Sequence, residues 1–116
     1  MRRLVLVLIV CLAAAPAPAQ TPVGDAQCQA LTKLALPHAS ITQATVERSG
    51  TFHEEHGPGG KPHDHGDLPP FCRVLGTATP VPGSKIGFEI WLPLGGWSGR
   101  LQAIGNGAYD DRIYYA

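Results

Sequence analysis

The chain has 116 residues, with nine basic and nine acidic side chains and a net charge of zero when the histidines are neutral. Such a balance provides no bulk positive charge to attract a nucleic acid or an anionic membrane surface, so we expect neither as a partner. A chain of this length can bury enough surface for one small core.

The first residues are typical of a signal peptide. Arg2 and Arg3 precede an uninterrupted apolar run over residues 4–15, which gives way to small residues and prolines. The run is too short to cross a bilayer, for which about 20 residues are needed. We expect cleavage after Ala19, which leaves residues 20–116 as a secreted or periplasmic protein with no membrane segment. That part keeps seven basic and nine acidic side chains, a net charge of −2.

The chain contains three cysteines. Cys11 leaves with the signal peptide, and Cys28 and Cys72 remain. An even pair in an oxidising compartment suggests a disulfide. Two unpaired, buried thiols are the alternative.

A short helix is expected at the start of the exported part. Asp25 is placed as its N-cap, and apolar residues recur at helical spacing until Pro37, which ends the helix. Cys28 lies on its first turn. Residues 41–46 follow with β-branched side chains and period-two alternation, which predicts a strand.

Residues 49–70 are rich in glycine, proline, histidine and acidic residues and have no apolar period, so we predict a long surface loop. Its imidazoles and carboxylates are competent metal ligands. The zinc motif H-E-x-x-H, however, needs histidines four apart on a helix, whereas His53 and His56 are three apart and glycines follow. We therefore predict a solvated loop and no metal site.

Three strands are predicted after this loop, over residues 71–78, 85–92 and 100–104. The first carries Cys72, and the last runs into Gly105. The middle strand has two distinct faces. They consist of Ile86, Phe88, Ile90 and Leu92 on one side, and of Gly87, Glu89 and Trp91 on the other.

Gly105, Asn106, Gly107 and Ala108 follow the last predicted strand directly. Backbone N–H groups in such a loop could face a developing oxyanion in an ester hydrolase. An Asn-Gly pair is also a strong signal of a plain hairpin turn, which the local sequence favours. No serine lies in the G-x-S-x-G motif that exposes a nucleophile, so a catalytic triad would have to come from elsewhere.

Four stretches together resemble the tannase and feruloyl esterase family, both in their residues and in the spacing between them. They are Cys28-x-x-Leu31 with Leu36-Pro37 and Ile41-Thr42; Leu68-Pro69-Pro70-Phe71-Cys72-Arg73-Val74; Ile86-Gly87-Phe88-Glu89-Ile90-Trp91-Leu92-Pro93; and Trp97-Ser98-Gly99-Arg100 leading to Gly105-Asn106-Gly107.

The resemblance implies an α/β-hydrolase fold with a lid domain, in which residues 20–116 are the N-terminal part, with a short helix and mainly antiparallel strands. It also implies hydrolysis of small aromatic-acid esters of the galloyl or feruloyl type by a Ser-His-Asp triad beyond residue 116. The segment alone is then expected to be inactive. No cofactor is expected in it, and a calcium ion would belong to the lid of the full-length enzyme.

The same resemblance implies the roles of four residues. Cys28 and Cys72 match cysteines that pair with each other in relatives. Ala108, preceded by Gly107, matches the position of a backbone oxyanion donor, although relatives usually carry glycine where Ala108 stands.

Two rival functions remain from the residues themselves. The first is a small exported metal-binding protein built around the histidines of residues 53–65. The second is a freestanding ligand-binding module that uses Trp91 and Trp97 as stacking surfaces.

Overall fold

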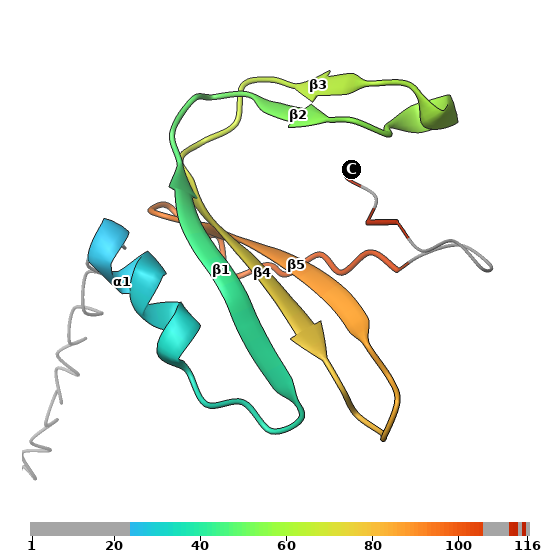
Figure 1. The fold of residues 1–116 in the computed structure, drawn as a ribbon. Coiled ribbons are helices and arrows are strands. Elements are labelled where there is room, and N and C mark those ends of the chain that lie inside the picture. The colour runs from blue at the N-terminus through green and yellow to red at the C-terminus, as the bar shows by residue number, and fades with distance from the viewer. Residues whose placement is uncertain (1–23, 106–111, 114, 116) are drawn as a thin grey trace, which may run out of the picture.

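The computed structural model describes residues 24–105, 112, 113 and 115. This part is an α/β arrangement with one short helix and antiparallel strands (Figure 1). Its elements, in chain order, are helix α1 (Asp25–Ala30) with the 3-10 turn η1 (Leu31–Lys33), β1 (Ala39–Glu47), β2 (Phe52–Glu54), the 3-10 turn η2 (Pro58–Gly60), β3 (His63–His65), β4 (Phe71–Ala78) and β5 (Ile86–Pro93).

The helix begins one residue earlier than predicted and ends sooner. Its N-cap is Gly24, whose backbone N–H donates to Gln27 Oε1 at 3.0 Å, while Asp25 stands in the first turn and accepts from Arg48 at 2.6 Å. After η1 the backbone is extended at Leu34 (φ −70°, ψ 123°). The chain therefore leaves the helix before Pro37, and it reverses direction through a bridge between residues 36 and 39.

The main sheet has the order β1-β4-β5, and both neighbouring pairs are antiparallel. Its register aligns Ala44, Val74 and Ile90 across the three strands. The predicted strand over residues 71–78 is confirmed with the same bounds. The strands predicted at 41–46 and 85–92 are also present, with ends shifted by one or two residues.

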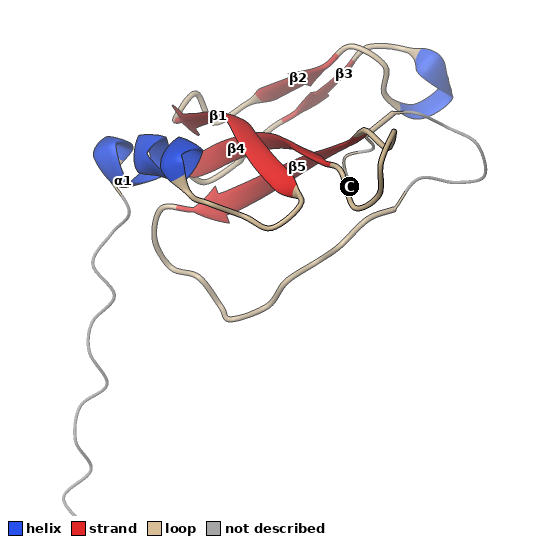
Figure 2. Cartoon of the chain, turned by 60° about the horizontal axis from the view of Figure 1, so that its bottom comes forward, coloured by secondary structure: helices blue, strands red, loops and turns tan. Residues whose placement is uncertain are grey.

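One face of this sheet packs against α1. The buried core lies there, and it consists of Cys28, Ala44, Cys72, Val74 and Leu94. A disulfide joins Cys28 of α1 to Cys72 of β4, with Cα atoms 5.8 Å apart, so the pairing implied by the family resemblance is present. Cys28 is the buried residue of this short helix, so the covalent link holds α1 on the sheet. Figure 2 shows the same layers from another side.

The prediction of an irregular loop over residues 49–70 was wrong in part. Strands β2 and β3 form an antiparallel hairpin there, with Phe52 opposite His65 and His53 opposite Asp64. The backbone N–H of Leu68 donates to Gly50 O at 3.1 Å and closes the base of the hairpin. An apolar period could not reveal these strands, because they are held by cross-strand imidazole–carboxylate pairs and by one aromatic anchor.

The strand predicted at residues 100–104 does not form in the part of the chain that is described. Leu101 is 85% exposed and Ile104 50% exposed. An alternating apolar sequence becomes a strand only where a neighbour accepts its backbone hydrogen bonds, and no described strand lies beside these residues. Within residues 24–105, no helix is long and apolar enough to cross a membrane.

Candidate functional site

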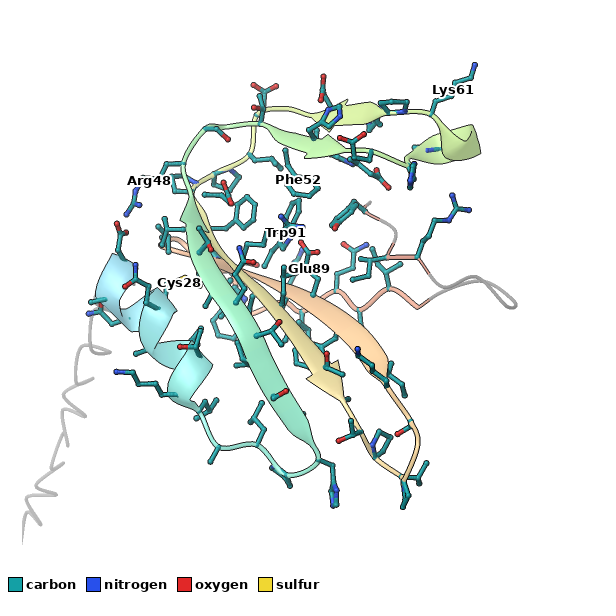
Figure 3. All side chains as sticks on the ribbon, viewed as in Figure 1. Cys28, Arg48, Phe52, Lys61, Glu89 and Trp91 are labelled. Carbon is teal, nitrogen blue, oxygen red and sulfur yellow. A yellow bond between two sulfur atoms is a disulfide. The ribbon has the colours of Figure 1, made fainter. Side chains whose placement is uncertain are left out.

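A cluster of aromatic side chains lies on the sheet face opposite α1, between the sheet and the β2–β3 hairpin. Trp91 of β5 is at its centre, stacked on Phe71 at 4.3 Å between ring centroids and met edge-on by Phe52 at 4.9 Å. Tyr115 stacks on Trp91 at 5.5 Å. Figure 3 shows Phe52, Trp91 and Glu89 in a row from the hairpin to the sheet. The cluster thus joins the hairpin, the sheet and residue 115.

The carboxylate of Glu89 is the polar centre of this cluster, and its side chain is only 3% exposed. Arg73 donates to both of its oxygens, at 2.6 and 3.1 Å. Trp91 Nε1 donates at 2.6 Å, and Tyr115 Oη donates at 2.7 Å. Four donated hydrogen bonds satisfy this buried carboxylate, as a charge in such a place requires.

These contacts fix the protonation states of the cluster. Burial alone would raise the pKa of Glu89, but the hydrogen bonds from its three partners outweigh burial and lower that pKa. The hydrogen bond to Glu89 raises the pKa of Arg73. Burial, followed by the hydrogen bond to Glu89, raises the pKa of Tyr115 to about 12. None of the three groups is therefore poised to exchange a proton near neutral pH. We call Glu89 with Arg73, Trp91 and Tyr115 the Glu89 anchor, because these contacts hold the sheet and residue 115 together.

The hairpin docks on this anchor through Phe52. The guanidinium of Arg73 lies over the Phe52 ring, 4.7 Å from its centroid, so the same arginine holds Glu89 and stacks on the hairpin. Behind Phe52, Glu54 is 5% exposed and accepts from His65 Nε2 at 3.0 Å. The hairpin therefore packs with part of its histidine-rich sequence facing inward.

The imidazoles of the hairpin pair with carboxylates. His53 Nδ1 lies 2.6 Å from Asp64 Oδ1, and that hydrogen bond raises the pKa of His53. His65 Nε2 lies 3.0 Å from Glu54 Oε2. The described residues contain no group of three or more histidine, cysteine, aspartate or glutamate side chains arranged to hold a metal ion.

A groove of about 420 Å³ runs between the hairpin and residues 112, 113 and 115. Its described walls include Phe52, Arg73 and Tyr115 from the cluster and the acidic and imidazole side chains of residues 53–56. No serine or cysteine is among the described residues that line it. The groove therefore offers aromatic and charged contacts but no nucleophile from the described part of the chain.

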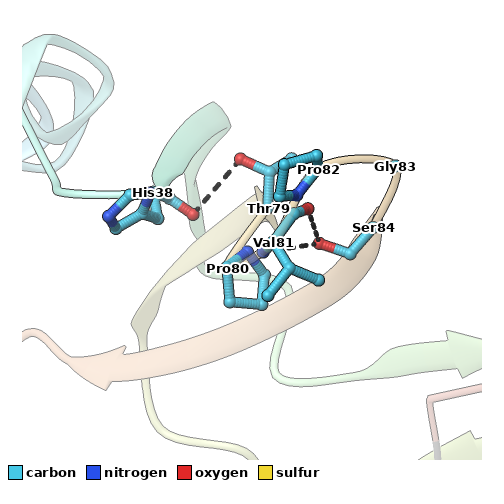
Figure 4. A pocket seen from close by; sticks show the side chains of 7 residues that line it. All are labelled: His38, Thr79, Pro80, Val81, Pro82, Gly83 and Ser84. Carbon is cyan, nitrogen blue, oxygen red and sulfur yellow. Dashed lines mark hydrogen bonds between the residues drawn. The ribbon is translucent and has the colours of Figure 1, made fainter.

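A second depression, of about 370 Å³, lies at the opposite end of the sheet (Figure 4). His38 takes part through its backbone carbonyl, which accepts from the Thr79 N–H at 2.7 Å. The hydroxyl of Ser84 donates to the carbonyl of Val81 at 2.7 Å within the turn that joins β4 to β5. The His38 carbonyl and the Ser84 hydroxyl thus bond groups in turns, and no hydrogen bond pairs the His38 ring with the Ser84 hydroxyl.

The two predicted oxyanion residues, Gly107 and Ala108, lie outside the described residues. Over residues 24–105, no serine hydroxyl is hydrogen-bonded to a histidine ring; Ser49 and Ser84 instead bond backbone groups in turns. The Glu89 cluster was not predicted. Its signal was present, because Glu89 and Trp91 share a strand face and Arg73 lies opposite Trp91 on β4.

Comparisons with known proteins place the chain near an ester hydrolase. No family model matches it. It is 38% identical over 109 residues to a protein named as an uncharacterized esterase from Xanthomonas campestris pv. campestris. The match covers 94% of this chain but 18% of that protein, so the chain spans less than a fifth of the relative's length. No solved structure matches. The chain is thus related in sequence to an esterase.

Proposed function

We propose that this chain is the N-terminal part of an exported carboxylic ester hydrolase of the tannase and feruloyl esterase type. The observation that carries the proposal is the 38% identity to a named esterase across 94% of the chain. The order of family-like blocks and the Cys28–Cys72 disulfide support it. The small share of the relative that is matched agrees with a triad located outside these residues.

In this proposal the segment contributes scaffold and one catalytic contact. The disulfide and the Glu89 anchor hold the helix, sheet and residue 115 together. A backbone N–H at Ala108, next to Gly107, donates to the carbonyl oxygen of an aromatic-acid ester as it gains negative charge. A serine from the remainder of an α/β-hydrolase attacks that carbonyl and displaces the alcohol, which leaves an acyl-enzyme. Water then cleaves the acyl-enzyme and releases the aromatic acid and the free serine.

The proposal is tested with the longest product of the reading frame that contains residues 1–116. We expect this product to hydrolyse methyl gallate or methyl ferulate and to lose activity with a serine-directed phosphonate. The 116-residue chain alone serves as the control and should release no acid. A long product without esterase activity, or a short chain with it, would contradict the proposal. A mature N-terminus at Gln20 in the culture fluid or periplasm would test export.

The role of the Ala108 amide has its own test. Proline has no backbone N–H, so Ala108→Pro should lower kcat about 100-fold or more and leave KM nearly unchanged. Ala108→Gly keeps the N–H and is the matched control. Equal loss of activity in both variants, or none in either, would exclude this amide as the donor.

A further inference from the structure

The outer strand of the sheet carries an uncovered apolar surface. We call Ile86, Phe88, Ile90 and Leu92 the β5 apolar face. Ile86 is 55% exposed, Ile90 41% and Leu92 38%, and none of the four side chains is charged. On the opposite side of the same strand, Glu89 is only 3% exposed. In β5 the carboxylate side chain is thus buried and the aliphatic side chains are exposed, which is the reverse of the usual distribution.

On the sheet face that carries the β5 apolar face, helix α1 covers residues of β1 and β4 but not β5. Helix α1 packs on β1, and the core residues of β1 and β4 on this face, Ala44, Cys72 and Val74, are buried. β5 follows β4 at the edge of the sheet, and Figure 1 shows it on the side away from α1. The β5 apolar face continues the surface that α1 covers elsewhere, but no described element covers it.

The segment that follows β5 shows the same lack of a neighbour. Leu101, Ile104 and Trp97 are 85%, 50% and 56% exposed. Residues 100–104 have the sequence of a strand, yet no described strand pairs with them. Extended apolar surfaces of this kind on a protein mark the sites where another part packs.

We propose that the β5 apolar face is the docking surface for the remainder of the longer polypeptide, through an uncharged, aliphatic layer of that remainder. This inference rests on the proposed function. The occupant follows from three observations. The relative extends well beyond the matched segment, the face has no charge to recognise a polar partner, and it adjoins the edge of the sheet that no strand of the described residues pairs with. A covalently linked neighbour also has a high effective concentration, which a second copy lacks.

Thiol labelling reports the burial of this face directly. Ile86→Cys places a thiol on the face, far along the strand from the disulfide, and Thr45→Cys places one on an exposed position of β1 as the matched control. In the long product we expect a maleimide to modify Ile86→Cys at least about 100-fold more slowly than Thr45→Cys, because a buried thiol reacts only after local opening. In the 116-residue chain both thiols should react quickly.

Two labelling outcomes would overturn the inference. The first is equal reactivity of the two thiols in the long product. The second is protection of Ile86→Cys already in the 116-residue chain, which would make the occupant a second copy if the protection depends on concentration, and a segment of this chain if it does not.

A charge substitution provides a second measurement that does not depend on cysteine chemistry. Ile90→Lys should leave the melting temperature of the 116-residue chain within a few degrees, since Ile90 faces solvent there. In the long product the same lysine would be buried without a partner, and we expect a fall in melting temperature of about 5 °C or more. Gln43→Lys, at an exposed position of β1 opposite Leu75, is the control and should change neither protein. An unchanged long product would refute docking on this face.

The outcome for docking is independent of the outcome for catalysis. A long product that hydrolyses esters while Ile86→Cys stays reactive would retain the proposed function and remove this inference. A long product that protects Ile86→Cys without hydrolysing esters would do the reverse.

Discussion

The ring of Phe88 on β5 lies directly over Gly76 on β4, its register partner. A Cβ atom at position 76 would stand 2.7 Å from Phe88 Cε1, closer than Cβ atoms approach carbon atoms in folded proteins. Glycine in a strand interior normally weakens the strand, and here it makes room for an aromatic ring that spans the sheet. The pair therefore fixes how β5 sits against β4.

We predict that Gly76→Ala lowers the free energy of unfolding by about 1–3 kcal/mol, because the new methyl group displaces the Phe88 ring. Gly87→Ala on β5 is the matched control, since a Cβ atom there meets nothing within 4 Å. Urea denaturation measures both variants. The destabilisation should shrink when Gly76→Ala is combined with Phe88→Ala; equal effects at positions 76 and 87 would contradict the close approach.

Replacing the buried carboxylate should cost more than replacing an exposed one. Glu89→Gln keeps the size of the side chain but removes the charge that two Arg73 nitrogens contact, and we expect a loss of about 2–3 kcal/mol of stability. The Arg48–Asp25 pair is the comparison, because its side chains are 52% and 61% exposed. Arg48→Gln should cost less than about 1 kcal/mol. Similar losses in thermal denaturation would mean that the Glu89 cluster is not an anchor.

The hydrogen bond from Tyr115 to Glu89 predicts a loss of stability at alkaline pH. Folding raises the pKa of Tyr115 from 10.0 to about 12, so the folded state favours the neutral phenol. Its contribution to stability is therefore complete below pH 10 and is lost as the pH rises towards 12. Absorbance at 295 nm should show one of the three tyrosines ionising near pH 12. That step should vanish in Tyr115→Phe; its persistence would assign it to another tyrosine.

The disulfide closes a loop with a sequence separation of 44 residues. Chain-entropy reasoning assigns about 4 kcal/mol to a loop of that length, a large share of the stability of a small domain. We expect reduction, or the paired change of Cys28 and Cys72 to alanine, to lower the melting temperature steeply and to release α1 first. Circular dichroism with and without reductant measures this. A melting temperature that does not respond to reductant would show that apolar contacts hold the helix.

Part of the fold could be predicted from local patterns. The strand predicted at residues 71–78 forms with those bounds, because β4 is the central strand and is paired on both sides. The hairpin of β2 and β3 was not predicted, because polar pairs such as His53–Asp64 and a single aromatic contact from Phe52 produce no periodic pattern in the sequence. The strand expected at residues 100–104 lacks a described partner, and pairing is not a local property.

The candidate site was less predictable than the fold. The family resemblance pointed to Cys28 and Cys72, which are bonded, and to Gly107 and Ala108, which lie outside the described residues. It did not point to Glu89. A lone acidic residue in a strand resembles a solvated side chain until Arg73, Trp91 and Tyr115 converge on it from three places in the sequence.

The sequence by itself determined the order of the main elements, the two faces of β5 and the relationship to an esterase, because each depends on residue types at fixed spacing. Only the tertiary structure decided which face of β5 is covered. Alternation separates Ile90 from Glu89, but burial depends on what packs above each face. The hairpin and Tyr115 cover the face with the carboxylate, whereas no helix or strand of the described residues covers the aliphatic face.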